Sequence, residues 1–589
     1  MPNNVDSSNN FKIKTPHAAV LVWNYIDRIS APSTGSDTQA SGVTNLDDTE
    51  PTILSTLSCI SIQTNKSKGQ PAGTFDLVLA PTKNWVSTLT AGSWICILMS
   101  NEPITQNDLK KANKRQVKMI GKIETVRVDT SMGDDGARNT RFHVSGVDWA
   151  HVFNNVIYVD NLIASANDPV SQGNAVAVAL RNLLFASDGT PKSFLVKDNL
   201  RSLINVFGQT IEGIEKNGSD INRLAGALYN FRMPKAMVEF FKFVGPDGNV
   251  SAKERRLNKV LNLVTGKFTD EGEYTPTNEA KGFIDPFSLQ GQHTFWQVLM
   301  ENSNPVLNEM FAEMNWSGDT DSDMSLQLTV FNRIKPFSYK DFDPSAGAGR
   351  DIASYFQLCP MHDIDPVEVM SINAGTNWRD KFNFVEIKPN FSDFNVIANW
   401  YKQKSQAFDA KAFEREGFRP LILETKQFPS GYEKPGGNFV DWDQLLNWVK
   451  LLREWYFNTH KMLNGTIVLH GQTDYIAVGD NIRFDAGLVN PTPNFNRNSI
   501  DNQENPYILA HVENISHSFG VSGDGSRSYT TTIQFVRGIL VNEDNISSGM
   551  GPLDDDASKV GINNSERNTL NVNSTSDPSD PDSVKIRGN

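Results

Sequence analysis

Glu309 and Glu313 lie four positions apart, and two carboxylates at this spacing could act together in acid–base catalysis. We expect the segment around them to be helical, which places both carboxylates on one face. Two carboxylates that flank a glycosidic bond can cleave it, one as general acid and the other as base or nucleophile. The alternative is an ion pair or a solvated face, and we favour it because charged residues at helical spacing usually serve that purpose.

The run His362-Asp363-Ile364-Asp365 carries imidazole and carboxylate groups, which are common metal ligands. The alternative is that this run simply begins a strand, and we favour that interpretation. His511 and His517 flank a predicted strand. We expect them at opposite or solvated positions rather than on a shared zinc ion.

Two glycine-containing motifs match known chemistry only in part. FGVSGDG resembles a nucleophile turn, but the GxSxG pattern fails at Asp524. Gly266-Lys267 lacks both the following Ser or Thr and the upstream glycine of a phosphate loop. We therefore predict no catalytic, cofactor-binding or metal-binding residue, no cofactor, and no enzymatic activity.

The composition bounds the possible classes of protein. With 589 residues the chain is long enough for several domains, each burying its own core. The net charge of −13 argues against a protein that coats nucleic acid, because such a protein needs a basic face. A neutral or acidic wall would still let DNA slide through a channel without sticking.

Three cysteines, Cys59, Cys96 and Cys359, lie in apolar strand-like or loop contexts. We interpret them as buried thiols in a reducing compartment, not as a disulfide framework or a zinc site. The polar first residues predict no signal peptide, and no apolar run approaches the ~20 residues that span a bilayer. We therefore predict no contact with a membrane.

The segment 441–460 is predicted to be a long amphipathic helix. Asp441 is its predicted N-cap, Gln444 completes a capping box, and Val440 forms a hydrophobic staple with Leu445. We assign its apolar face to a core or a subunit interface, and that face consists of Trp442, Leu445, Leu446, Val449, Leu452 and Tyr456.

A pattern of strands and turns occurs twice in the chain. Four features recur in the same order: AGSWICILM (91–99) with VGDNIRF (478–484), Ile123-Glu124-Thr125-Val126 with Val512-Glu513-Asn514-Ile515, GDDGARNT (133–140) with SGDGSRSY (522–529), and TRFHVSG (140–146) with TTIQFVRG (531–538). Chance recurrence of turn glycines is the alternative. The shared order favours a duplicated antiparallel β module.

The block 291–337 is predicted to be a helix, a second short helix opened by Asn304-Pro305, and a strand formed by SLQLTVFNRI. Its residues resemble the central block of bacteriophage tail and baseplate hub proteins of contractile-tailed phages. The residues that carry the resemblance are Phe295, Trp296, Leu299, Asn304, Pro305, Asn308, Glu309, Phe311, Arg333, Lys335, Pro336 and Phe337. Segments such as GTFDLVLAP, GFRPL, LNGTIVLHG and VRGI continue the likeness in order over roughly residues 50–540.

The resemblance implies a structural hub. Such a protein forms a homotrimer whose β modules build a pseudo-sixfold ring, which joins the hexameric tail tube protein to the trimeric central spike protein. It contacts other baseplate proteins, and DNA only passes through its lumen. Its place is the tail baseplate of the virion, assembled in the host cytoplasm. Two alternatives stay open: a tail-associated cell-wall hydrolase, or a receptor- or polysaccharide-binding tail protein that uses the loop 488–507.

The expected fold is α+β and multidomain, with two tube-like antiparallel β-barrel modules plus helical and mixed insert domains. The predicted parts are a flexible arm over 1–16, a first tube-like β module over 17–160, a mainly helical region with a long loop over 161–290, a mixed α/β insert over 291–360, a second tube-like β module over 361–540 that contains the helix 441–460, and an extended polar tail over 541–589. Within the third part we expect 245–282 to be a solvated loop. The tail is too polar to fold alone, so we expect a partner or a neighbouring subunit to hold it.

Overall fold

The computed structural model describes the greater part of the two predicted β modules and part of the sequence between them. The described residues are 15–24, 50–132, 136, 138–154, 193–195, 200–201, 203–204, 233–251, 257–265, 280–283, 293–318, 324–335, 360–390, 406–429, 442–457, 459–472, 474–489 and 507–541. Several predictions lie outside these residues: the N-cap at Asp441 and its staple partner Val440, Cys359, Gly266-Lys267, most of the 488–507 loop, and nearly all of the polar tail.

The first β unit contains seven strands and two short helices. They are β1 (His17–Trp23), β2 (Thr52–Leu54), β3 (Cys59–Ser67), β4 (Thr74–Leu79), α1 (Trp85–Thr88), β5 (Trp94–Ser100), β6 (Val117–Met132), β7 (Arg138–Asp148) and η1 (Trp149–Asn154). The strands β1 and β5 are apolar at nearly every position because both of their faces are covered. A strand buried on both faces has no solvated side on which polar residues could alternate.

The second β unit is built from the end of the chain. Its elements are β15 (Met361–Asp363), η7 (Pro366–Glu368), β16 (Val369–Gly375), β21 (Leu463–Leu469), β22 (Asn481–Asp485), η10 (Ala486–Leu488), β23 (Tyr507–Val521) and β24 (Arg527–Val541). An insertion separates β16 from β21 and contains η8 (Trp378–Asp380), β17 (Phe384–Pro389), β18 (Gln406–Phe408), α10 (Ala410–Glu416), β19 (Pro420–Thr425), β20 (Gln427–Pro429), α11 (Trp442–Phe457) and η9 (Thr459–Lys461).

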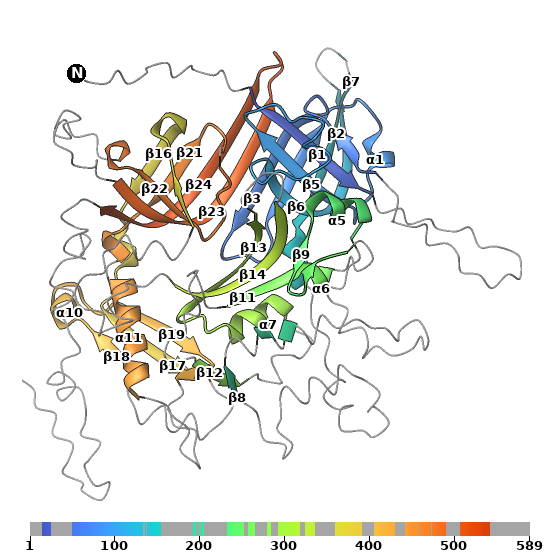
Figure 1. Cartoon of the computed structure of the whole chain (residues 1–589). Coiled ribbons are helices and arrows are strands. Elements are labelled where there is room, and N and C mark those ends of the chain that lie inside the picture. The colour runs from blue at the N-terminus through green and yellow to red at the C-terminus, as the bar shows by residue number, and fades with distance from the viewer. Residues whose placement is uncertain are drawn as a thin grey trace, which may run out of the picture.

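Between the two units lies a mixed region. It contains β8 (Ser193–Leu195), α5 (Lys235–Phe241), β9 (Val244–Gly245), β10 (Gly248–Asn249), α6 (Leu257–Val260), β11 (Leu261–Thr265), β12 (Ala280–Phe283), α7 (Phe295–Asn302), β13 (Asn308–Ser317) and β14 (Ser325–Ile334). The strands β11, β14 and β13 form a small sheet below the main one (Figure 1). No helix in the described part of the chain is long and apolar enough to cross a bilayer.

The strands of both units join in one large sheet. The antiparallel character predicted for the β modules is confirmed, but the described part of the chain is β-rich with few helices, where an α+β fold was expected. Among the described residues this sheet has thirteen strands, and its path runs β16-β21-β24-β23-β3-β4-β7-β6-β5-β1-β2, with β22 and β15 attached beside β23. Figure 1 shows the orange and red strands of the second unit continuing into the blue strands of the first. The described strands of a single chain leave this sheet open, and neither unit is closed into a barrel of its own.

The two units share one strand order. The first unit runs β3-β4-β7-β6-β5 and the second runs β16-β21-β24-β23-β22, with antiparallel pairing at each step. This is the arrangement expected of a duplicated module. The units differ at their last strand, because β1 pairs antiparallel with β5 whereas β15 pairs in parallel with β22.

The β-bulges of the two units also coincide. The residue that the pairing skips is Glu124 in β6 and Glu513 in β23, which are the residues that the sequence match aligns. A second bulge falls at Ile60 in β3 and at Met370 in β16. A bulge bends its strand and strengthens the local twist, so two shared bulges give the two units the same curvature.

One of the four sequence matches is out of register. Pairing places Gly146 opposite Ile123, and it places Phe535 opposite Val512. Gly146 is therefore equivalent to Phe535, not to Gly538 as matching the two segments by their final glycines predicts. The displacement runs through the whole segment, because Thr140 opposite Thr130 is equivalent to Tyr529 opposite Phe519, so residues 140–146 correspond to 529–535.

The long predicted helix is confirmed as α11, and its apolar face is buried as expected. Leu445, Leu446, Val449 and Leu452 are all at most 3% exposed. The helix contacts β17, β18 and β20, so this face packs on the insertion's own strands and belongs to the core of the chain.

Three expectations for the middle of the chain are wrong. Glu309 and Glu313 lie on strand β13, not on a helix. Asn304-Pro305 opens a turn rather than a helix, because Asn304 takes the left-handed conformation at φ +58° and the chain then enters β13 directly. The stretch 245–282 is not simply a solvated loop, since Leu257 and Leu261 within it are buried.

Candidate functional site

The candidate site is the junction where the two β units meet. Residues 514–520 of β23 pair antiparallel with residues 61–67 of β3, and this seam makes the two units one sheet. Residues at the start of β23 pair with β22 instead, so β23 changes neighbour along its length. The apolar face of the seam includes Ile62 and Phe519, which are fully buried in the same core cluster.

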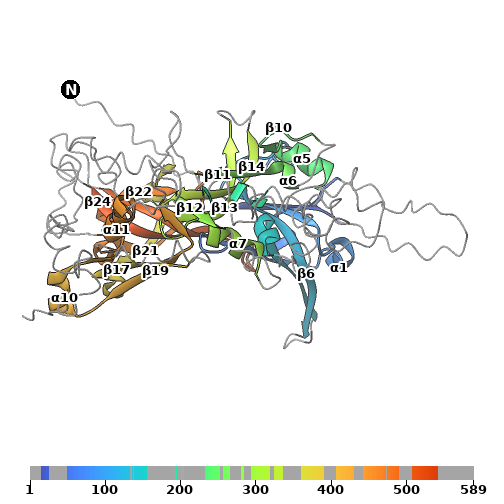
Figure 2. The same ribbon diagram turned by 90° about the horizontal axis from the view of Figure 1, so that it is seen from below.

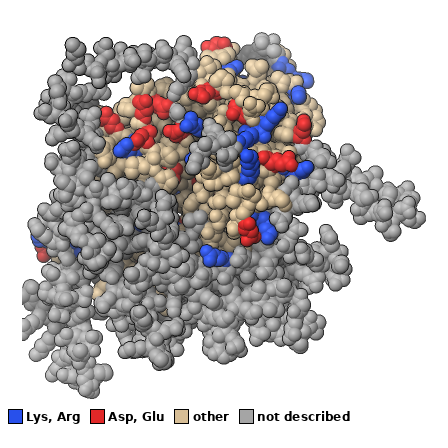
Figure 3. All heavy atoms as spheres, viewed as in Figure 1, with Lys and Arg blue, Asp and Glu red and all other residues tan. Residues whose placement is uncertain are grey.

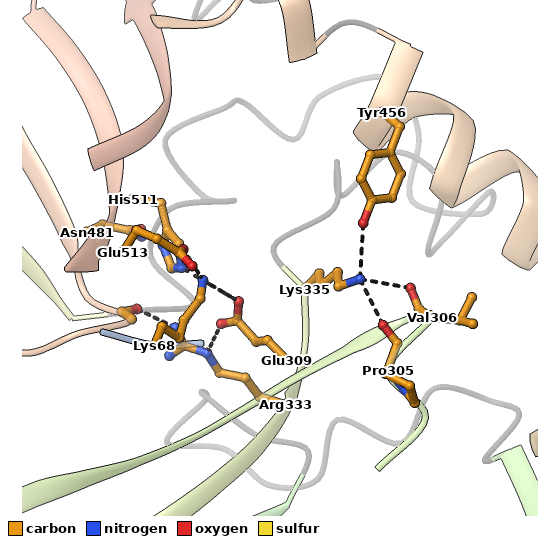
Figure 4. Close-up of polar contacts among 11 residues, drawn as sticks. Lys68, Pro305, Val306, Glu309, Arg333, Lys335, Tyr456, Asn481, His511 and Glu513 are labelled. Carbon is orange, nitrogen blue, oxygen red and sulfur yellow. Dashed lines mark hydrogen bonds and ion pairs between the residues drawn. The ribbon is translucent and has the colours of Figure 1, made fainter. Parts of the chain in front are cut away.

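Buried charged side chains lie beside this seam (Figure 4). Lys66 lies near the end of β3 and Lys68 directly follows that strand. Glu309 and Glu313 come from β13, and Arg333 comes from β14. Glu309, Glu313 and Arg333 are at most 8% exposed. Uncompensated charges at this depth would cost several kcal/mol each, so their partners determine whether the junction can form.

Glu309 is the centre of the first group. Its carboxylate accepts from Arg333 Nε at 2.5 Å and from Lys68 Nζ at 2.9 Å. Lys68 Nζ also lies 3.0 Å from the carboxylate of Glu513, the bulge residue of β23. Burial alone would raise the pKa of Glu309, but Lys68 and Arg333 outweigh it and hold that pKa well below its usual value.

Arg333 reaches from β14 across to the second unit. Its guanidinium lies 4.9 Å from the ring centre of Phe311 and donates to the backbone carbonyl of Gly479. A Cβ at Gly479 would stand 2.5 Å from Phe311 and 2.8 Å from Arg333. Gly479 is therefore needed both for its left-handed backbone and for the space that the arginine occupies.

His511 completes this group from β23. Its Nδ1 shares a hydrogen bond of 2.8 Å with Asn481 Oδ1, and its Nε2 lies 3.7 Å from Glu309. Burial, together with the charge of Lys68, lowers the pKa of His511 to about 3, against the opposing effect of Glu309. The imidazole is therefore neutral at neutral pH.

Lys66 forms the second group. Its Nζ lies 2.8 Å from Asp148 and 3.5 Å from Glu313. Tyr475 donates its hydroxyl to Glu313 at 3.2 Å. Burial lowers the pKa of Lys66, but Asp148 and Glu313 outweigh it and raise that pKa above its usual value. Burial, together with the negative charges of Asp148 and Asp480, outweighs the effect of Lys66 and raises the pKa of Glu313.

A third polar contact fixes α11 to the middle of the chain. Lys335, at the end of β14, donates to the carbonyls of Pro305 and Val306 at 2.9 and 3.1 Å and to Tyr456 Oη at 3.3 Å (Figure 4). Glu309, Arg333 and Lys335, which belong to the residues that carry the resemblance to hub proteins, thus all make polar contacts within the chain.

The geometry does not suit glycoside cleavage by Glu309 and Glu313. Four residues of strand separate their backbones by about 13 Å, whereas paired catalytic carboxyl groups stand about 5–9.5 Å apart. Both carboxylates are also held in buried ion pairs. Ion pairing, the favoured alternative, is what the structure contains, although on a strand.

The candidate metal residues each have another partner. His362 Nε2 lies 2.9 Å from Asp480, Asp363 pairs with Arg483, and Asp365 caps η7. Within the described ranges, no group of three or more His, Cys, Asp or Glu side chains is placed to hold a metal ion.

Two further expectations concern histidines and cysteines. His511 and His517 are both buried, so of the two expected arrangements, opposite or solvated positions, the solvated one is wrong. His517 shares a hydrogen bond of 3.0 Å with Thr531 in the neighbouring strand. Cys59 and Cys96 are buried free thiols, as predicted, and burial raises the pKa of Cys59 to about 12.

The sequence reasoning missed Lys66, Lys68 and Asp148. The signal available in the sequence was weak: two lysines at alternate positions, which continue the face of β3 that carries Ile62 and Thr64. Lysines at such positions are usually solvated, and only the approach of β13 shows that these two are not.

Comparison with known proteins gives neighbours in structure only. No family model matches the sequence, and no curated protein matches it. Among solved structures, the chain is similar to a tail protein from Neisseria meningitidis, with 12% identity, 91% of this chain and 98% of that chain covered, and a TM-score of 0.41. It is also similar to a 43 kDa prophage tail protein from Shewanella oneidensis, with 10% identity, coverage of 89% and 98%, and a TM-score of 0.37. A third similar structure is a chain of a PdpA–VgrG complex, with 9% identity, coverage of 89% and 65%, and a TM-score of 0.32.

Proposed function

We propose that this chain is a structural hub protein of a bacteriophage tail. In this role three copies form a ring of six β units that joins a hexameric tail tube to a trimeric central spike. One observation supports it above the others: the chain contains the same five-stranded unit twice, with the same bulges, joined by strand pairing. The ordered sequence segments that resemble hub proteins support it independently.

The presence of two similar β units in each chain explains how a ring of three chains can match a sixfold partner. Two equivalent units per chain and three chains give six similar units, so one face can match a sixfold partner while the remaining domains keep threefold symmetry. A head-to-tail contact that closes into a ring also removes exposed sheet edges, which otherwise pair indiscriminately. Closing the sheet of all six units into one barrel would create a lumen.

The buried junction suits an adapter that must hold its shape. The Lys68–Glu309–Arg333 group joins β3, β14 and the Gly479 turn, so each unit is fixed to the middle region. Breaking one such pair leaves a buried charge without a partner, which is costly. The angle between the two units is therefore tied to one arrangement of side chains.

The proposed partners follow from this role. They are two further copies of the chain, the tail tube protein, the central spike protein and other baseplate proteins, with DNA only passing through the lumen. On the face drawn in Figure 3, Lys and Arg side chains of described residues lie among Asp and Glu side chains. Such mixed charge does not bind a polyanion strongly, which is compatible with a passage for DNA.

A direct measurement of mass tests the proposal. Mass photometry of the purified chain, over a range of protein concentrations, should show a species near three protomers. Negative-stain images of that species should show a ring with six similar densities around a lumen. A chain that stays monomeric at every concentration, or that forms a closed dimer, would contradict the proposed ring.

An activity test separates the remaining alternatives. We expect no clearing of bacterial cell wall in a zymogram of the purified chain, and no retention on immobilised host polysaccharide. Cell-wall clearing would instead assign the chain to the tail hydrolases, and retention on the polysaccharide would assign it to the receptor-binding tail proteins.

A further inference from the structure

Several strand edges of the large sheet have no partner among the described strands, and two of them belong to equivalent positions of the repeated units. One is the outer edge of β6 beyond Lys122, where β5 has ended. The other is the outer edge of β16, which pairs only with β21. Figure 2 shows the β6 hairpin projecting beyond the rest of the molecule, so that its edge is open to another chain.

The equivalence of the two β units shows which paired edge within the chain each of these two edges corresponds to. The outer edge of β6 is equivalent to the part of β23 that pairs with β3, and the outer edge of β16 is equivalent to the edge of β3 that pairs with β23. Each chain therefore contains one complete seam between units and the two halves of a second seam. Six strands of the sheet lie between the two halves, and the halves do not pair with each other within one chain.

The complete seam gives the register of the incomplete one. In the β23–β3 seam, Ile515 lies opposite Lys66, His517 opposite Thr64, and Phe519 opposite Ile62. The bulges shared by the two units fix which residues are equivalent, so β6 residues can be matched to β23 residues and β16 residues to β3 residues.

We propose that β6 of one copy pairs antiparallel with β16 of a second copy, with Val128 directly opposite Ala374. Thr130 then lies opposite Ile372, as Phe519 lies opposite Ile62 within the chain. This inference rests on the proposed ring and specifies the contact between its subunits. The occupant of both edges is a second copy of this chain.

The residue types on the two edges fit this register. Side chains that would share the buried face are Val126, Val128, Thr130, Ile372 and Ala374, all of them apolar or β-branched. Such residues pack well on a pleated surface. In the complete seam, the equivalent positions Ile515 and Phe519 are buried.

The opposite face of both edges is polar. It presents Arg127, Asp129 and Ser131 on β6, and Ser371 and Asn373 on β16. A slip of one residue would place apolar side chains against polar ones, so the alternation selects the proposed register. Val128 is 51% exposed and Met132 at the tip of β6 is 69% exposed. Pairing with a neighbouring strand would lower the exposed fraction of these side chains.

Disulfide trapping tests the register in the full chain. In an antiparallel pair, opposite Cα atoms lie about 4.5–5.5 Å apart, which is within the range that a disulfide spans. We expect the double variant Val128→Cys/Ala374→Cys to form disulfide-linked dimers and trimers under mild oxidation. A mixture of the two single variants should form linked dimers but no linked trimers, because each chain then carries only one introduced cysteine.

The matched control moves one cysteine along the strand. In Val128→Cys/Met370→Cys the second thiol lies four residues away from Ala374, about 13 Å along the strand, and should not cross-link. The parent chain, oxidised in parallel, reports any bond made by the native cysteines. Both substituted sites are at sheet edges, and an unchanged melting temperature of the reduced variant verifies that it folds.

The outcomes separate this inference from the proposed ring. Cross-linking of the Val128/Ala374 pair but not of the Val128/Met370 pair supports the register. A species of three protomers in mass photometry without cross-linking of the first pair, or with stronger cross-linking of the control, overturns the register and leaves the ring standing. Absence of both the oligomer and the cross-link overturns the ring and the seam together.

Discussion

Gly92 and Gly479 occupy the same place in the two β units. Each has φ +86°, and each donates its backbone N–H to the residue before a bulge, Ile123 in one unit and Val512 in the other. The hydrogen bonds measure 2.7 and 2.9 Å. Their surroundings differ, because a Cβ at Gly92 would meet open space whereas one at Gly479 would meet Phe311 and Arg333. The same turn geometry thus meets an additional steric requirement in the second unit.

Alanine substitutions should separate the two requirements. Gly92→Ala introduces only the cost of the left-handed backbone, and we expect a loss of about 1–2 kcal/mol in the free energy of unfolding. Gly479→Ala adds a clash with Arg333, so its loss should be clearly larger. Urea unfolding followed by tryptophan fluorescence measures both. Equal losses in the two variants would contradict the steric role assigned to Gly479.

Removing the arginine should leave a buried carboxylate with too little compensation. We expect Arg333→Met to lower the free energy of unfolding by about 3–5 kcal/mol, because Glu309 is then left buried with Lys68 as its remaining close cation. The double variant Arg333→Met/Glu309→Gln should lose less than the sum of the two single variants. Strictly additive losses, measured by urea unfolding, would show that the pair is not coupled.

The buried neutral His511 should make stability depend on pH. Its pKa in the folded chain is lowered from 6.5 to about 3, so the unfolded chain binds the proton more readily. The stability that this difference contributes is fully present above pH 6.5 and is lost as the pH falls toward 3. We expect His511→Gln to show a shallower fall than the parent chain in urea midpoints measured between pH 7 and 4. An identical pH dependence in both proteins would refute the assignment.

The buried face of α11 should not tolerate a charge. Val449 is fully buried, so we expect Val449→Asp to destabilise the insertion by about 3 kcal/mol or more and, under the proposed function, to prevent assembly of the chain into tails. Leu446→Asp should act in the same way, since Leu446 is 3% exposed. Val449→Ile, which keeps an apolar side chain, is the matched control. Normal tails that contain the aspartate variant would show that this face is not in a core.

The sequence alone determined the local features of the fold. The period of Leu445, Val449 and Leu452 predicted α11, because burial on one helix face is visible in the spacing of apolar residues. The aligned Ile123-Glu124 and Val512-Glu513 pairs predicted a repeated strand, since the residues at bulges and turn glycines recur at equivalent positions of the two units.

Other local predictions failed for a physical reason that is also local. Glu309 and Glu313 fit helical spacing and equally fit one face of a strand, since four is a multiple of the strand period. The left-handed Asn304 redirects the chain before any second helix can start. Matching by final glycines misplaced Gly146, because the glycine that ends the matched segment in the second unit, Gly538, lies three residues beyond the structural equivalent, Phe535.

Only the tertiary structure decided which partners meet. Lys68 and Glu309 are 241 positions apart, and nothing in either segment indicates that the two would share one ion pair. The same holds for the strand edges, because β3 has a partner in β23 while the equivalent β16 has none among the described strands. A strand's sequence specifies which face is apolar, but its neighbours are specified by the packing of the whole chain.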